Sequence, residues 1–165
     1  MSYRVEPLAD HDLATFDCGH PDLDRWLADH AHSARGQGTR TYVLVDDDLV
    51  RGYFAIAPHL LDREHAPPKL GRGAARQIPA ILLAKLALDR SLHGQALGSE
   101  LLVFALRTIL DAAARAGGRI VVVDAIDDAA ASFYVHHDFE PIPNNPRRLV
   151  MKLSTAARAL GVEWP

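Results

Sequence analysis

The spacing of apolar residues predicts alternating strands and helices along the first third of the chain. Residues 2–8 alternate weakly between apolar and polar positions, as in a strand with one buried face. From Pro21, which suits a first helical turn, apolar residues recur at helical spacing until Gly36-Gln37-Gly38 ends the helix. Residues 39–45 and 49–56 are rich in β-branched and aromatic side chains and predict a hairpin with an acidic turn.

A buried strand, a long helix and a second buried strand are predicted in the middle of the chain. Residues 58–76 hold several prolines and glycines and predict a loop, whereas residues 79–88 are nearly continuously apolar, as in a strand covered on both faces. A helix is predicted over residues 99–116, stopped by Gly117-Gly118, and an apolar strand over residues 120–126. Because a helix joins the two strands, this order predicts a parallel pair.

The last third predicts a short helix, a final strand and a tail helix. Asp127 and Asp128 are expected to cap and charge the start of a helix over residues 129–137. Residues 149–153 predict the last strand, and Ser154 is expected to cap a short helix after it. The whole order predicts an α/β or α+β fold, with a mixed central sheet, a parallel pair around the long helix, and one domain over residues 1–165.

Composition limits the class of protein. A length of 165 residues fits one domain, and a hydrophobic fraction of 48% is too high for a disordered chain. No apolar run approaches the ~18–20 residues of a membrane helix, and residues 1–6 lack the apolar stretch of a signal peptide. The lone Cys18 excludes an internal disulfide and a zinc site built from cysteines. These observations predict a cytoplasmic domain.

Charge is unevenly distributed, although the net charge is only −3. Residues 1–50 carry four basic and ten acidic side chains, whereas residues 51–90 carry seven basic and three acidic ones. Because fields in salt are screened within about 10 Å, a local basic patch on an acidic protein can still bind an anion. A solvated loop is the alternative, and charge alone leaves both interpretations open.

The strand end and turn over residues 86–99 form the most informative segment. A buried strand runs into a glycine-containing turn, which opens the long helix. Four N–H groups lack intrahelical partners at a helix start, and the helix dipole adds partial positive charge there. The segment therefore predicts a cradle for phosphate or pyrophosphate, with an ordinary strand-to-helix turn as the alternative. Its glycine spacing fits neither the dinucleotide-binding fingerprint nor the P-loop.

Residues 93–98, His-Gly-Gln-Ala-Leu-Gly, resemble the acetyl-CoA pyrophosphate loop of the GCN5-related N-acetyltransferases (GNATs). That pattern is Gln or Arg, two variable residues, Gly, one variable residue, and Gly or Ala; His93 and Ala96 depart from it. Residues 124–139 are similar to the family's strand, helix and aromatic tail, with Asp138 where glycine is common. The resemblance covers nearly the whole chain and implies the GNAT fold, with acetyl-CoA as cosubstrate.

Three further segments narrow the resemblance. These are residues 16–19 with 23–27, residues 40–43 and residues 79–89, and they are similar to the acetyltransferase toxins of bacterial toxin–antitoxin modules. Such toxins acetylate the free α-amine of an aminoacyl-tRNA, which then no longer accepts a peptide. Their usual partner is a small antitoxin with a ribbon-helix-helix DNA-binding end. The resemblance therefore implies aminoacyl-tRNA and such an antitoxin as partners, and it is compatible with a homodimer.

The resemblance also implies roles for individual residues. Tyr134 matches the tyrosine that faces the departing CoA sulfur, where a phenol donates a proton. Without the resemblance, a core tyrosine packed beside Phe133 is the simpler interpretation. The residues implied in acetyl-CoA binding lie on one strand, in the loop and around the following helix: Leu86, Ala87, Leu88, His93, Gly94, Gln95, Ala96, Leu97, Gly98, Ser99, Asp124 and Phe133.

Basic residues are expected to supply affinity for RNA, in a salt-dependent manner. They are Arg35, Arg40, Arg72, Arg76, Lys85, Arg90, Arg147 and Arg148. The nine histidines include no i,i+4 pair with a carboxylate partner, so no metal site is predicted. Cys18 has no base near it in sequence and is expected to be a structural thiol.

Two other functions stay open at this point. The enzyme could instead acetylate a small-molecule amine or a protein N-terminus. Alternatively, the departures at His93 and Ala96 allow a homologue that binds acetyl-CoA without catalysis.

Overall fold

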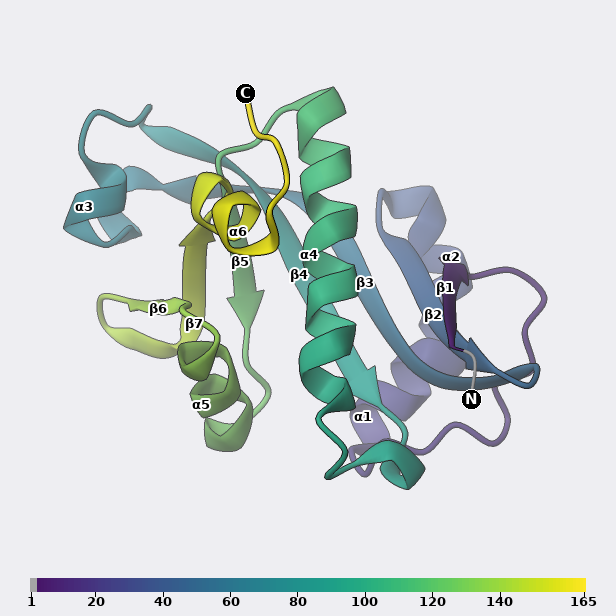
Figure 1. Ribbon diagram of the computed structural model, residues 1–165. Coiled ribbons are helices and arrows are strands. Elements are labelled where there is room, and N and C mark those ends of the chain that lie inside the picture. The colour runs from purple at the N-terminus through teal and green to yellow at the C-terminus, as the bar shows by residue number, and fades with distance from the viewer. Residues whose placement is uncertain (1–2) are drawn as a thin grey trace. The chain divides into compact units, whose positions relative to one another are not determined.

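The structure, a computed structural model, describes residues 3–165, so Ser2, the first residue of the predicted opening strand, lies outside the described residues. Seven strands are hydrogen-bonded in the order β1-β2-β3-β4-β5-β7-β6 (Figure 1). The chain divides into two compact units. The first holds the residues up to Ala57 and Ala84–Ala105, and the second holds Pro58–Leu83 and Leu106–Pro165. Strands β3 (Leu49–Asp62) and β4 (Gln77–Leu88) and helix α4 (Leu97–Ala116) contribute residues to both.

The first unit builds a hairpin and a bent helical segment on the amino-terminal part of the sheet. Its strands are β1 (Arg4–Pro7), β2 (Arg40–Asp46) and the first part of β3 (Leu49–Asp62), all antiparallel. The helical segment runs through α1 (Pro21–Arg25), the π-helical turn η1 (Trp26–His30), α2 (Ala31–Ala34) and the 3-10 turn η2 (Arg35–Gln37). The predicted helix and hairpin are thereby confirmed.

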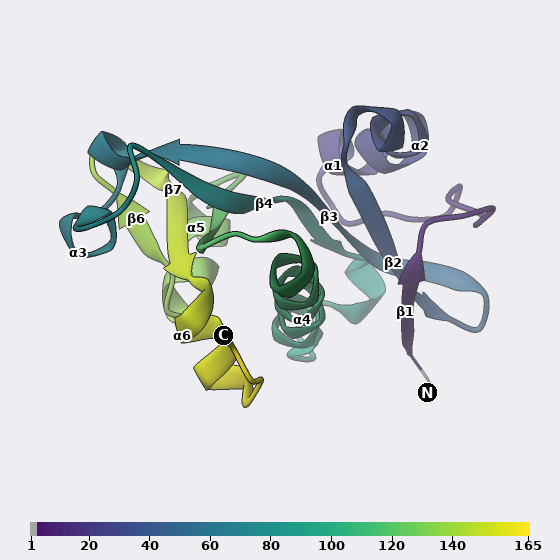
Figure 2. The same ribbon diagram turned by 90° about the horizontal axis from the view of Figure 1, so that it is seen from above.

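The α1 segment and the start of α4 lie on opposite faces of β3, as Figure 2 shows from above, and two neighbouring residues of β3 explain this layering. Tyr53 is buried against the α1 segment and donates its hydroxyl to the Leu23 carbonyl at 2.8 Å. Gly52 points the other way, where an added Cβ would lie 3.4 Å from Leu101 of α4 and 3.3 Å from the Ala87 carbonyl. Alternation along the strand therefore places the α1 segment on one face and the start of α4 on the other.

The second unit carries the parallel pair that the sequence predicts. Residues Ala80–Leu83 of β4 pair in parallel with Ile120–Val123 of β5. One face of this part of the sheet buries an aliphatic cluster that includes Ile78, Val122 and Ile142. The elements of this region are η3 (Arg63–His65), α3 (Pro68–Gly71), β4 (Gln77–Leu88), α4 (Leu97–Ala116), β5 (Ile120–Asp124), α5 (Asp128–His136), β6 (Glu140–Ile142), β7 (Asn145–Lys152) and α6 (Leu153–Leu160).

The prediction of a loop over residues 58–76 is wrong in its first part. Strand β3 continues through Pro58 to Asp62. Pro58 is exposed, which a residue without a backbone N–H tolerates, and the apolar Leu61 is 3% exposed against the second unit's core. The burial of Leu61 outweighs the break expected from proline.

The tail helix forms, but the capping prediction for Ser154 is wrong. The N-cap of α6 is Lys152, whose side chain makes no capping hydrogen bond, and Ser154 is the second residue of the helix. The fully buried Leu153 fixes where the helix begins, because its side chain completes the core. Within residues 3–165, no helix is long and apolar enough to cross a membrane.

Candidate active site

The carboxyl end of β4 leaves backbone groups outside the parallel pairing. The register with β5 ends at Leu83, five residues before the strand itself ends. Ala87 is buried in the first unit's core, whereas Leu86 and Leu88 are partly exposed. A ligand with amide groups can therefore add to this strand as a further strand would.

The loop after β4 turns through two residues with left-handed backbone. Gly94 has a φ of 78° and Ala96 a φ of 60°. Ala96 occupies the place of the pattern's first glycine, and its backbone is in the left-handed conformation, which glycine adopts more readily than other residues. Helix α4 begins directly afterwards at Leu97, two residues earlier than predicted, so the N–H groups of its first turn lie at the end of the loop. This geometry suits an anionic ligand.

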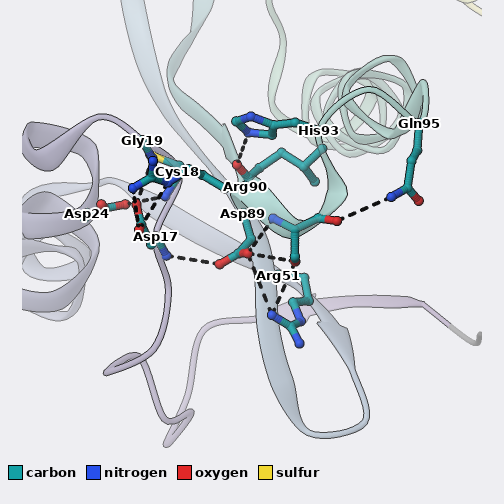
Figure 3. A network of polar contacts seen from close by, with 11 residues as sticks. Asp17, Cys18, Gly19, Asp24, Arg51, Asp89, Arg90, His93 and Gln95 are labelled. Carbon is teal, nitrogen blue, oxygen red and sulfur yellow. Dashed lines mark hydrogen bonds and ion pairs between the residues drawn. The ribbon is translucent and has the colours of Figure 1, made fainter.

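The side chain of His93 points back to the strand. Its Nε2 donates to the carbonyl oxygen of Leu88 at 2.7 Å (Figure 3). Nε2 and one strand carbonyl thus satisfy each other, and a phosphate contact from this nitrogen requires the hydrogen bond to break. Gln95 is likewise turned toward the preceding segment, where its side-chain amide donates to the Ser91 carbonyl at 3.3 Å.

A buried carboxylate holds the junction between strand and loop. Asp89 is 5% exposed and accepts hydrogen bonds from the backbone N–H of Ser91 at 3.0 Å and from its hydroxyl at 2.8 Å. It also accepts from the backbone N–H of Asp17 at 3.0 Å, which ties the segment before α1 to the loop (Figure 3). Arg51 lies 3.7 Å from the same carboxylate.

These contacts keep Asp89 ionised. Burial opposes the charged form, but the hydrogen bonds from Ser91 and Asp17 and the charge of Arg51 outweigh it and hold the pKa of Asp89 below its ordinary value. Next to it, Arg90 pairs with Asp17 at 3.0 Å. Sequence reasoning missed this network, because hydrogen bonds between residues some 70 positions apart have no local pattern.

Tyr134 lies in the second unit, on α5. The helix begins at Asp128, one residue before the predicted start, and Asp127 caps it as predicted, since its carboxylate accepts from the Ala130 N–H at 2.8 Å. The Tyr134 ring is 6% exposed and meets Phe133 and Phe139 edge-on, with ring centroids 5.3 and 5.4 Å apart. Burial strongly raises the pKa of Tyr134, so the phenol carries its proton at neutral pH.

Asp124, at the end of β5, is engaged by a predicted RNA-binding residue. Arg148 of β7 donates through Nε and Nη2 to the two carboxylate oxygens of Asp124, at 2.7 and 2.8 Å. Its Nη1 lies 3.3 Å from Nε2 of His59. Burial and the Arg148 charge lower the pKa of His59. This pair stabilises the strand end and competes with any role of either residue toward a ligand.

The eight predicted RNA-binding residues fall into two groups. Arg90, Arg147 and Arg148 each face a carboxylate, with distances of 3.0 Å to Asp17, 3.1 Å to Asp128 and 2.7 Å to Asp124. Among the residues that the structure describes, no carboxylate pairs with the other five, namely Arg35, Arg40, Arg72, Arg76 and Lys85. Of these eight cations, the five of the second group therefore keep a charge that no carboxylate of the described residues neutralises.

Two other chemical candidates are placed by the structure. Cys18 is 4% exposed, and burial raises the pKa of its thiol to about 11, which suits a structural residue. Asp62, Glu64 and His65 each offer one ligand atom within 4.8 Å of the others, but all three are solvent-facing side chains of a kind common without an ion.

Known proteins share this chain's sequence and fold. The tRNA-acetylating toxin of Mycobacterium tuberculosis is 36% identical over 151 residues, which are 91% of either chain. The AtaT toxin complexed with acetyl-methionyl-tRNAfMet superposes with a TM-score of 0.86 at 27% identity, over 96% of this chain and 99% of that one. A mutant AtaT bound to the C-terminus of the antitoxin AtaR and acetyl-CoA gives 0.83 at 28% identity, over 98% and 99%. No protein-family model matches the chain.

The mixed sheet, the interrupted pairing of β4 and the loop before α4 are those of a GNAT acetyltransferase. The chain belongs to the toxin acetyltransferases of that family.

Proposed function

We propose that this protein is a toxin that transfers the acetyl group of acetyl-CoA to the α-amine of an aminoacyl-tRNA and so blocks translation. The observation that carries the proposal is the 36% identity to a tRNA-acetylating toxin over 91% of the chain. The solved AtaT complexes with acetyl-methionyl-tRNA and with acetyl-CoA support the same pair of reactants. Because its substrate serves translation, the toxin acts in the cytoplasm, and the whole chain works as one catalytic domain.

The cosubstrate fits the end of β4 and the loop that follows. The pantetheine arm adds to the backbone of Leu86 and to the N–H of Leu88, whose carbonyl oxygen already accepts from His93. The pyrophosphate takes the N–H groups from Gly94 to Ser99. When bound, acetyl-CoA supplies the thioester. The strand end and loop are fixed by the Asp89 network before the ligand arrives, so little order has to be gained on binding.

The acceptor amine needs little activation. An α-amine with a pKa of ~7.7 is roughly one-third neutral near pH 7.4, whereas a lysine amine with a pKa of ~10.4 is only about 0.1% neutral. The neutral nitrogen attacks the thioester carbon, the new C–N bond forms, and the C–S bond breaks as CoA leaves. Tyr134, whose phenol stays protonated at this pH, donates the proton that the departing sulfur needs. The surplus proton of the acylated amine is released to solvent, and the phenolate takes up one proton from solvent, which restores the phenol.

The antitoxin is the second partner of this protein. AtaT is solved with the C-terminus of AtaR and, as a complex with AtaR, on DNA. A small antitoxin with a ribbon-helix-helix DNA-binding end fills the same place here.

The test replaces the Tyr134 hydroxyl and follows labelled acetate. Purified protein is incubated with labelled acetyl-CoA and charged total tRNA, and the label on the aminoacyl group is measured. Tyr134→Phe keeps the ring and removes the proton donor, so the rate is expected to fall at least 100-fold with acetyl-CoA binding retained. Tyr42→Phe, at a half-buried ring that stacks on Phe54, is the matched control and is expected to stay active.

The alternatives predict different outcomes in the same assay. Acetyl-CoA binding with no label on any tRNA, together with labelled small amines or protein N-termini, would replace the tRNA proposal. Near wild-type transfer by Tyr134→Phe would remove the assigned role of the phenol.

A further inference from the structure

One cation of the first unit is held over an aromatic ring beside the predicted acetyl-CoA strand. The Nζ of Lys85 lies 5.5 Å from the ring centroid of Trp26. The Trp26 ring is stacked on Tyr53, with centroids 6.0 Å apart and planes 8° from parallel. Tyr53 is in turn fixed by its hydrogen bond to Leu23. The ammonium group therefore has a defined position, set by two rings of the core.

The helical segment is built irregularly at this point. Trp26 opens the π-helical turn η1, in which the Ala31 N–H reaches back five residues to the Trp26 carbonyl. Such a turn holds one residue more than an α-helical turn, and turns of this kind are frequent at functional sites. Trp26, the first residue of this turn, carries the ring over which Lys85 of β4 lies.

Lys85 lies in β4 directly beside the residues that are proposed to bind the pantetheine arm and its thioester. It precedes Leu86 directly, and a strand rises about 3.3 Å per residue, so Lys85 lies within about 10 Å of Leu88 along the strand. Its side chain is half-buried, shares the sheet face of Ala87 and the α1 segment, and has no carboxylate partner among residues 3–165. A partly desolvated ammonium without a counter-charge favours binding of an anion.

We propose that Lys85, positioned by Trp26, binds a backbone phosphate of the single-stranded 3′ end of the aminoacyl-tRNA. The inference rests on the proposed function. The aminoacyl ester is carried by the terminal nucleotide, whose own phosphodiester must accompany the amine to the β4 strand end. A phosphate bound there orients the acceptor, whereas the N–H groups of the α4 loop bind the phosphates of the cosubstrate. Lys85 is thus a substrate-positioning residue.

The experiment separates the two sources of phosphate. Lys85→Met keeps the length of the side chain and removes its charge. Its KM for aminoacyl-tRNA is expected to rise about tenfold, because one charge-assisted phosphate contact is lost, while its KM for acetyl-CoA is unchanged. With an aminoacyl ester of adenosine that carries no phosphate, variant and wild type are expected to have equal KM. Lys85→Arg restores the charge and is expected to act within threefold of wild type.

A binding measurement supports the kinetics without needing turnover. Fluorescence anisotropy of a labelled tRNA is expected to show weaker binding to Lys85→Met, with a salt slope smaller by about 0.7. Lys69→Met, at an exposed lysine of α3, is the matched control and is expected to leave KM, affinity and salt slope unchanged.

Three outcomes would overturn the inference: an unchanged KM and affinity for tRNA, an equal loss with the phosphate-free ester, or a raised KM for acetyl-CoA. A different result would reject the proposed function alone. In that case the wild type binds tRNA more tightly than Lys85→Met does but acetylates no tRNA, and the phosphate contact of Lys85 is retained.

Discussion

Two residues show why this chain departs from the GNAT pattern without losing the fold. Ala96 and Asp138 both stand where the pattern has glycine, and their φ angles are 60° and 70°. The pattern has glycine in those places because the backbone is left-handed there, and other residues adopt that conformation only at a cost in free energy. Aspartate tolerates that region better than alanine does, so the larger strain lies at Ala96.

Replacing Ala96 by glycine is expected to stabilise the protein. The free energy of unfolding should rise by about 1 kcal/mol as the left-handed conformation loses its Cβ penalty, and the KM for acetyl-CoA should stay unchanged. Urea denaturation measures the change. Ala114→Gly, at an exposed position inside α4, is the control and should lower stability by about 1 kcal/mol. Equal destabilisation by both substitutions would show that Ala96 is unstrained.

At the scale of elements, Asp89 joins the end of β4, the 3-10 turn η4 (Arg90–Leu92) and the segment before α1. Asp89→Asn keeps the shape of the side chain, but its amide NH2 then faces the backbone N–H of either Asp17 or Ser91, so two donors meet without an acceptor. It is expected to lower the free energy of unfolding by about 2 kcal/mol at pH 7. Asp111→Asn, in an exposed i,i+4 pair with Arg115, is the control and should change stability by less than about 0.5 kcal/mol.

The cost of Asp89→Asn is also expected to depend on pH. The folded protein lowers the pKa of Asp89, so the carboxylate's contribution is complete above the unfolded pKa of ~3.9 and is lost as pH falls through the folded pKa. The stability difference between wild type and variant, measured by urea denaturation across pH, should shrink below about pH 4. A constant difference down to low pH would show that the charge contributes nothing.

The elements with strong periodicity could be predicted from sequence, and those decided by distant packing could not. The apolar strands β4 and β5 and the helix between them follow from local pattern. The extension of β3 past Pro58 depends on the core contact of Leu61, and the three-residue strand β6 is too short for a pattern. Within the site, the loop over residues 93–98 was recognisable, whereas the Asp89 network and the Lys85–Trp26 contact join residues remote in sequence.

For the molecule as a whole, a net charge of −3 is compatible with RNA binding because five of the predicted RNA-binding cations have no carboxylate partner among residues 3–165. If all five reach phosphates, the slope of log affinity against log salt approaches about −4.5. Affinity for charged tRNA, measured by filter binding, is therefore expected to fall steeply from about 50 to about 200 mM salt. An affinity that does not change over that range would contradict an electrostatic mode of binding. Arg147 is already paired with Asp128, so Arg147→Ala should alter the salt slope less than removal of any of the five cations.

The shielding of Cys18 has a practical consequence for spectroscopy. With a pKa of about 11 and 4% exposure, its thiolate fraction at neutral pH is on the order of one in ten thousand, so alkylating dyes leave it untouched. Since the sequence holds no other cysteine, the natural chain already serves as an unreactive background. Cysteines introduced at the exposed Gln37 and Ser154, one in each compact unit, would carry a donor and an acceptor whose energy transfer reports the separation of the units in solution.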